Sequence, residues 1–252
     1  WRAPWGLTQE HEMPNKAKGK QALVCKLSPS NSDKWLNCPG YGQAVAALPP
    51  REEVLNDAAD EGTAAHSLFE YCGRMGVPPQ DLLGSKFGRF TVDDEMASSV
   101  QAALLWVRDW EVKRAGSVQH EVPLELPLGD YVLTGTSDVI GYSHKTLALL
   151  AFDYKHGQGV WVDAENNSQV GLYILAAIHY LEKAGLKYGE VLGVIAQPRI
   201  DWSGRPVIRE WMPTRQTLEA LKARAVEATY EALIPGAPRR AGSHCKWCPA
   251  AA

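Results

Sequence analysis

The sequence has 252 residues, of which 45% are hydrophobic and 22% charged, and its 26 basic and 29 acidic side chains give a net charge of −3. This composition is typical of a globular protein with a sizeable core, and it excludes a disordered chain, a collagen repeat and a small disulfide scaffold. Because the chain as a whole is slightly acidic, any contact with nucleic acid must depend on local basic patches.

Two features of the sequence favour a cytoplasmic protein with no membrane partner. No apolar run reaches the roughly 18 residues that a membrane-spanning helix requires, and the best candidate, residues 170–181, contains His179 and Tyr180. Residues 1–14 lack the apolar segment of a signal peptide. We therefore expect the five cysteines to lie in a reducing compartment, as buried thiols or metal ligands rather than disulfides.

The first half of the sequence predicts an arm followed by helices. Residues 1–27 carry Lys16, Lys18 and Lys20, which indicate a basic N-terminal arm or simply a solvated tail. Residues 28–117 form a helical region that contributes His66 and Cys38. Its helices are expected from Ser28-Pro29-Ser30 to about Cys38, over residues 60–75 and over residues 94–114.

The second half predicts a sheet with its own helices, over residues 118–235. Stretches rich in β-branched and aromatic residues favour an antiparallel meander at 118–126, 131–142 and 146–154. A helix, a buried strand, a return strand and a last helix follow at 166–183, 191–199, 207–211 and 214–233. The fold class is thus α/β, a mixed central β-sheet flanked by helices with an N-terminal helical layer. Residues 236–252 form a cysteine-containing C-terminal tail.

Two aspartates and a lysine in this sheet predict a metal site. Asp138 follows a Gly-Thr-Ser segment, and Asp153-Tyr154-Lys155 comes fifteen residues later. Residues two apart on a strand share one face, so Asp153 and Lys155 lie together and a hairpin can bring Asp138 beside them. Two close carboxylates repel unless a cation lies between them, and oxygen ligands suit Mg²⁺ or Mn²⁺. Taken alone, the same residues also fit a surface ion pair and a turn aspartate.

The order of motifs along the chain is more specific than any one of them. It reads Gly-Thr-x-x-His ending at His66, a glutamate, Gly-x-x-Asp ending at Asp138, Asp-x-Lys, and then Gln-x-x-x-Tyr formed by Gln169 and Tyr173. This set resembles the RecB-type nuclease domain of the PD-(D/E)xK superfamily, over about residues 28–248. The segments at 36–40 and 164–169 are most similar to its phage and prophage group. The resemblance implies a restriction-endonuclease-like core that hydrolyses phosphodiester bonds.

The resemblance also implies roles for individual residues. His66, Asp138, Asp153 and the carbonyl of Tyr154 would be metal ligands, and Lys155 would activate or position a water molecule. Gln169 and Tyr173 would hold the substrate backbone or brace the lysine. Glu121 would be a ligand, directly or through water, with an edge-strand surface glutamate as the alternative. The expected cofactor is Mg²⁺ or Mn²⁺.

The cysteines suggest a second metal site. Cys245-x-x-Cys248 has the spacing of metal ligands, and by resemblance Cys38 joins them, since related nucleases use one early cysteine and a late cysteine group to hold a [4Fe–4S] cluster. The fourth ligand position falls near residue 254. The open alternatives are a longer natural chain, substitution by Cys25, Cys72 or His244, zinc in place of iron, and no cluster. Such a cluster would join the two ends of the chain and would not be a catalyst.

The same resemblance implies that the protein is a Mg²⁺- or Mn²⁺-dependent deoxyribonuclease of phage recombination or repair. Its expected partner is DNA, as single strands or duplex ends, which it would process as an exonuclease. A phage recombinase or single-strand-binding protein is a further expected partner. Trp161 and Trp202 could stack on bases, and candidate phosphate contacts are Lys155, His156, Arg199, Arg205, Arg209, Arg239, Arg240 and the N-terminal lysines. The alternatives are a catalytically silent DNA-end-binding module of the same fold and a zinc protein in which only the cysteine tail matters.

Overall fold

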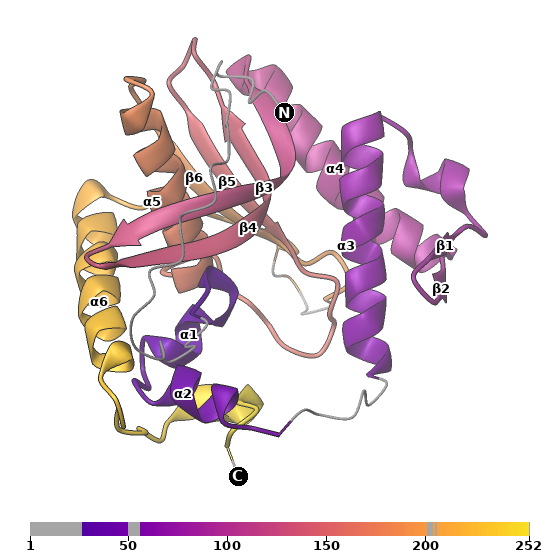
Figure 1. Cartoon of the computed structure of the whole chain (residues 1–252). Helices are drawn as coiled ribbons and strands as arrows, with labels where there is room; N and C mark the ends of the chain where they lie inside the picture. Colours follow the sequence, from indigo (N-terminus) through magenta and orange to yellow (C-terminus); the bar gives the residue numbers. More distant parts are fainter. Residues whose placement is uncertain (1–26, 50–55, 201–203, 205, 252) are drawn as a thin grey trace, which may run out of the picture.

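The computed structural model describes residues 27–49, 56–200, 204 and 206–251 (Figure 1). Most of the predicted basic arm, with its three lysines, lies outside these residues, as do Cys25, Trp202 and Arg205. Within them, no helix is both long and apolar enough to cross a membrane. The α-helices are α1 (Ser32–Trp35), α2 (Tyr41–Ala46), α3 (Asp57–Met75), α4 (Asp94–Arg114), α5 (Ser168–Lys183) and α6 (Arg215–Leu233).

A five-stranded mixed sheet forms the centre of the fold, with strand order β3-β4-β5-β6-β7. Strands β4 and β5 pair antiparallel with their predecessors, as the predicted meander requires. Helix α5 then returns the chain so that β6 lies parallel to β5, and β7 pairs antiparallel with β6. The strands are β3 (Ser117–Leu128), β4 (Tyr131–Tyr142), β5 (Leu149–Tyr154), β6 (Val191–Ala196) and β7 (Ile208–Trp211). The mixed sheet expected from the sequence is confirmed.

Helices cover both faces of this sheet (Figure 1). Helices α3 and α4 bury one apolar cluster, which includes Leu68, Val100 and Phe152. Helices α5 and α6, with α1 at their side, bury a second cluster that includes Trp35 and Ile174. Both β5 and β6 are buried along their whole length, because each side of these central strands faces a helix layer.

Several short elements, most of them in the N-terminal helical region, were not predicted from the sequence. A hairpin of two-residue strands, β1 (Lys86–Phe87) and β2 (Phe90–Thr91), lies between α3 and α4. The predicted first helix begins as a 3-10 turn, η1 (Pro29–Asn31), and further 3-10 turns are η2 (Pro79–Leu82) and η3 (Ser243–Trp247). Such short elements carry too few residues for a periodic pattern.

Local capping fixes the helix that carries two predicted site residues. The Asn167 side chain accepts a hydrogen bond from the backbone N–H of Val170, so α5 begins at Ser168. This cap satisfies one of the free N–H groups of the first turn. Gln169 therefore projects from the first turn of α5, and Tyr173 lies one turn further on.

Strand β3 changes its packing face at Glu121. Val118 and His120 pack toward α3 and α4, whereas Val122 and Leu124 enter the core beneath α5 and α6. Even-numbered residues of a regular strand would share one face. The register with β4 is the same on both sides, at His120↔Val139 and at Val122↔Ser137, but the ladder skips the position between them. Glu121, at that position, adopts a φ of 51°. This left-handed residue turns the strand at the point where Glu121 lies opposite Asp138.

Candidate functional site

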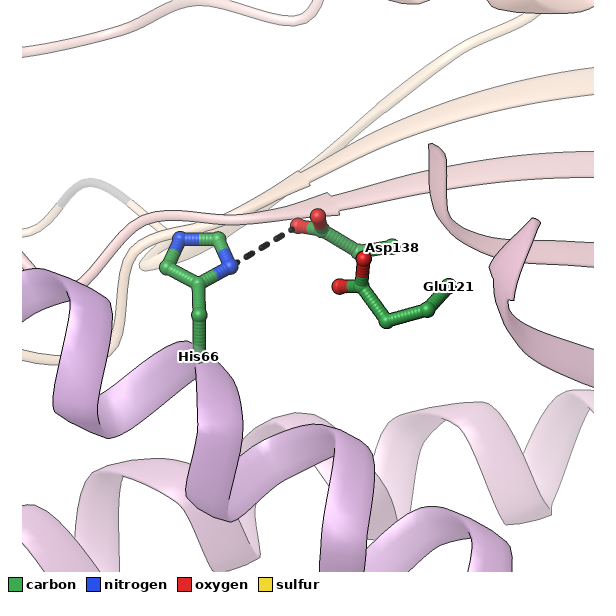
Figure 2. A group of neighbouring side chains, drawn as sticks. All are labelled: His66, Glu121 and Asp138. Atoms are coloured by element: carbon green, nitrogen blue, oxygen red, sulfur yellow. Dashed lines mark ion pairs between the residues drawn. The ribbon is translucent and has the colours of Figure 1, made fainter. Parts of the chain in front are cut away.

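His66, Glu121 and Asp138 converge from three different elements (Figure 2). One potential ligand atom from each side chain lies within 4.8 Å of the other two, and His66 Nδ1 is 3.5 Å from Asp138 Oδ2. Among the residues that the structure describes, this is the only such group of three or more histidine, cysteine or acidic side chains. Helix α3 supplies the imidazole, while β3 and β4 supply the two carboxylates.

Asp138 lies where the pairing between β4 and β5 ends. The last paired residues are Val139 and Phe152, and beyond them the backbone N–H of Tyr154 donates to Asp138 Oδ2 at 2.7 Å. The side chain thus replaces a carbonyl as the acceptor for this N–H. Burial disfavours protonated His66, but the hydrogen bond and charge of Asp138 outweigh it and raise the pKa of His66.

A second group of side chains lies on the α5 side of β5. Asp153 and Lys155 project from the same face of the strand, and Lys155 Nζ lies 2.9 Å from Asp153 Oδ2. Gln169 joins both, because its Nε2 donates to Asp153 Oδ1 at 2.6 Å and its Oε1 accepts from Lys155 Nζ at 3.2 Å. The three side chains form a closed ring in which the amide uses both of its polar ends.

Tyr173 lies next to this ring, one helical turn after Gln169. Burial raises the pKa of its hydroxyl, and the charges of Asp153 and Asp138 raise it further, against a hydrogen bond with Gln169. The phenol is therefore neutral and lies within the field of both aspartates. The structure thus brings together Asp138, Asp153, Lys155, Gln169 and Tyr173, as the sequence predicted.

The carboxylates of the site outnumber the positively charged side chains beside them, and this repulsion adds to the raised pKa values of two of them. Burial raises the pKa of Glu121 to about 7, and Asp138 and Glu70 contribute to the rise. Burial also raises the pKa of Asp153, with Asp138 adding to the effect and Lys155 opposing it. Carboxylates in this state are stabilised by a cation between them. The donor set, one imidazole and carboxylate oxygens, consists of groups that bind divalent metal ions.

This chain belongs to the DUF2800 family. The model of that family, described as "Protein of unknown function (DUF2800)", matches residues 25–252. The match includes every side chain of the two groups described above.

A solved structure shares the fold of this DUF2800 chain. It is named "Putative exonuclease" from Eubacterium rectale, is 14% identical, and has a TM-score of 0.51 over 91% of this chain and 88% of its own. A second structure, that of SSO0001, is 13% identical and has a TM-score of 0.31 over 82% of this chain and 88% of its own. The first similarity supports the α/β fold with its helix-flanked mixed sheet.

The convergent group of the DUF2800 chain differs from the predicted ligand set at Asp153 and at Tyr154, whose carbonyl was the predicted ligand. The convergent group contains Glu121, expected to bind directly or through water, whereas the carboxylate of Asp153 is held by Lys155 and Gln169. Tyr154 reaches the group through its backbone N–H. Its side chain lies on the face of the sheet opposite to Asp153, where its ring meets the His66 imidazole edge to face at a centroid distance of 5.3 Å. Its hydroxyl lies 2.8 Å from His156 Nδ1 and 3.0 Å from Ser99 Oγ.

Three side chains that were predicted to contact DNA have hydrogen-bond or ion-pair partners within the protein. His156 is buried against Tyr154, and Arg199 forms ion pairs with Glu61 and Glu95. The buried Arg209 donates to Gln197 and lies over the ring of Trp161, 4.1 Å from its centroid. These side chains brace the loops that follow β5 and β6, and a contact of any of them with DNA stays a prediction. Arg239 and Arg240 are exposed, as expected.

Gln197 holds the loops beside the site together. Its side chain is 2% exposed and makes four hydrogen bonds. Nε2 donates to the carbonyls of Gly157 and Val160, and Oε1 accepts from Val162 N–H and Arg209. Every bonding position of the amide is used, and the loop between Lys155 and α5 is fixed by it.

Cys38 and Cys245, from the two ends of the described fold, both have their sulfur next to the backbone of Arg240. Cys38 is buried, and its sulfur accepts a hydrogen bond from the backbone N–H of Arg240 at 3.4 Å. Cys248 packs against the apolar cluster that contains Cys38. In the described residues their sulfurs, with that of Cys245, do not form a group within 4.8 Å, although the sulfurs of a zinc site lie about 3.8 Å apart. Cys72 is buried in α3, away from them.

Proposed function

We propose that this protein is a divalent-metal-dependent DNA nuclease of the RecB-type PD-(D/E)xK class. One observation carries the proposal: the ligand group of His66, Glu121 and Asp138 lies beside a buried aspartate that is paired with a lysine. A structural ion pair does not require a second, convergent set of metal-ligating atoms. The similar structure bears the name "Putative exonuclease", which supports the same reaction class.

The three convergent side chains would hold the metal ion, with Asp153 and the backbone of Tyr154 next to them. Their unfavourable mutual charge is the physical reason that a cation would bind there. When bound, Mg²⁺ or Mn²⁺ would neutralise phosphate charge and make a hydroxide available near neutral pH.

Lys155 is the side chain placed to act on the substrate directly. Its side chain is 29% exposed, and Asp153 and Gln169 fix the direction of the ammonium group. Asp153 also raises the pKa of Lys155 against the effect of burial, which keeps the group charged. A fixed ammonium group can orient an attacking water or stabilise charge that develops on a phosphoryl oxygen.

DNA is the proposed substrate, as single strands or duplex ends, and the process is exonucleolytic. Exposed Arg239 and Arg240 lie in a segment without acidic residues from 232 to 251. Arg240 is paired with Glu231, so Arg239 is the residue of the two that supports local positive charge here. We assign Cys38, Cys245 and Cys248 to a [4Fe–4S] cluster that joins the chain ends, with zinc as its rival. A role in phage recombination or repair, with a recombinase or single-strand-binding protein, stays a prediction.

A cleavage assay tests the proposal. End-labelled single-stranded and duplex DNA are incubated with the protein in Mn²⁺, Mg²⁺ or EDTA. We expect metal-dependent release of short products, reduced about 100-fold or more by Asp138→Asn and by Lys155→Ala. Exposed residues provide matched controls, Asp130→Asn and Lys145→Ala, which should retain activity. DNA binding without cleavage by the wild type in either metal would instead identify a silent end-binding module.

A further inference from the structure

We propose that helix α3 positions Glu121 in addition to supplying His66. In this arrangement Gly73 and Arg74 hold the backbone of β3 so that the Glu121 carboxylate faces His66 and Asp138. The inference rests on the proposed function, since it concerns how the metal-ligand group is built. Gly73 and Arg74 are positioning residues, because they contact β3 and act through Glu121.

The conformation of Glu121 needs an explanation outside its own sequence. Its φ of 51° lies in the left-handed region, and side chains other than glycine, asparagine and aspartate adopt it at a cost. Such backbone strain persists only where surrounding contacts impose it, and it is concentrated at functional sites. At Glu121 the strain has a visible result, since β3 changes its packing face there and the carboxylate joins the ligand group.

Arg74 supplies one of these contacts. Its Nη2 donates to the backbone carbonyl of His120 at 2.9 Å, which is the carbonyl of the peptide bond that leads into Glu121. The guanidinium is itself held by Glu70, one turn earlier on α3, whose Oε1 lies 2.8 Å from Nη1. The orientation of the His120–Glu121 peptide is therefore set by a hydrogen bond from a charged donor.

Gly73 is the second feature of α3 that holds β3 in place, because its lack of a side chain lets His120 pack directly against the helix. The ring of His120 lies so close to α3 that a Cβ built on Gly73 would be 2.2 Å from its nearest ring atom. Glycine inside a helix is less favourable than alanine, so its presence here has a packing role. Phe69 meets the same ring edge to face at a centroid distance of 5.2 Å, and His120 is only 7% exposed.

All these contacts come from one face of α3. His66, Phe69, Glu70, Gly73 and Arg74 follow the three- and four-residue spacing of neighbours on a helix surface. The helix therefore carries one ligand and fixes the backbone of another. A displacement of His120 away from α3 would move Glu121 relative to His66, even though neither ligand is altered.

A pair of glycine substitutions in α3 tests the inference. Gly73→Ala places a methyl group against His120, whereas a Cβ at Gly62 meets nothing within 4 Å. Mn²⁺ binding is measured by isothermal titration without DNA. We expect Gly73→Ala to weaken Mn²⁺ binding by roughly tenfold or more, the usual effect of disturbing groups that orient metal ligands, and Gly62→Ala to leave it unchanged.

Two further variants separate positioning from a general loss of structure. Arg74→Gln, which keeps the helix and adds no bulk, should also weaken Mn²⁺ binding. The double variant Gly73→Ala/His120→Ala removes the ring that the new methyl group meets, so it should recover part of the affinity lost in Gly73→Ala. If the wild type binds Mn²⁺ and both Gly73→Ala and Arg74→Gln bind it equally well, the inference is wrong and the proposed function stands. If the wild type binds no Mn²⁺, both are wrong.

Discussion

The ammonium group of Lys155 lies 2.9 Å from a carboxylate oxygen of Asp153, and that aspartate is only 2% exposed. Lys155 directly follows the last residue of β5 and is two residues after Asp153, so the period of extended backbone places both side chains on one face. Gln169 closes the group from α5. Because the carboxylate is buried, this pair contributes to stability as well as to the proposed reaction.

Removal of the lysine alone should destabilise the fold. Lys155→Met leaves Asp153 buried without its cation, and we expect the free energy of unfolding to fall by about 3 kcal/mol. The double variant Asp153→Asn/Lys155→Met removes both charges and should recover part of this loss. Urea denaturation at pH 7 in EDTA measures both. Equal stability of the single variant and the wild type would show that the pair is not coupled in this way.

Removal of the Glu121 charge should increase the stability of the metal-free protein. At pH 8 Glu121 is ionised near Asp138 and Glu70, so Glu121→Gln relieves repulsion and should stabilise the protein by about 1 kcal/mol, or roughly 2–4 °C in Tm. The same variant should lose the Tm increase that Mn²⁺ gives the wild type. Thermal unfolding with and without Mn²⁺ checks both effects.

Glu125→Gln is the matched control, because Glu125 is exposed on the same strand. It should leave the metal-free Tm and its response to Mn²⁺ unchanged. A full Mn²⁺ response in Glu121→Gln would remove Glu121 from the ligand group.

The conformation of the loop after Lys155 should depend on the hydrogen bonds of the Gln197 side chain. Gln197→Ala leaves Arg209 and the Val162 N–H without their acceptor in a buried site, and we expect a loss of about 2–3 kcal/mol in unfolding free energy. Limited proteolysis should cut first within residues 157–162. The control Gln158→Ala changes an exposed amide of the same loop and should have little effect. Cleavage elsewhere, with this loop intact, would contradict the proposed brace.

Cys38 and Cys245 should be needed for the proposed cluster, whereas Cys72 should not. Anaerobically purified protein should absorb visible light and contain about four iron atoms per chain, and Cys38→Ser or Cys245→Ser should abolish both properties. Cys72→Ser should retain them, because Cys72 is buried elsewhere and burial raises its pKa to about 11. Colourless protein with stoichiometric zinc would favour the rival metal, and metal-free protein would exclude both.

Long periodic segments were predictable from the sequence alone. Helix α4 lies at the predicted residues 94–114, because its apolar spacing is regular and Asp93 caps its start. Strand β4 also has its predicted bounds. The juxtaposition of Asp138, Asp153 and Lys155 followed from strand alternation and one hairpin, both of which are local rules.

Features that depend on tertiary contacts were not predictable. The left-handed conformation of Glu121 arises from contacts with α3, and the residues near it in the sequence give no signal for it. Arg209 and Trp161 resemble nucleic-acid contacts in composition, yet they pack on each other. The partner of a charged side chain is set by the fold, and a sequence pattern does not reveal it.

The most direct test of the account is titration of Mn²⁺ into the metal-free protein and into Asp138→Asn, with Asp130→Asn as control. The account predicts Mn²⁺ binding by the wild type and by Asp130→Asn, and at least a tenfold weaker affinity for Asp138→Asn, since Asp138 is a proposed ligand. Equal affinity of Asp138→Asn and the wild type would contradict the assignment of the metal to this group.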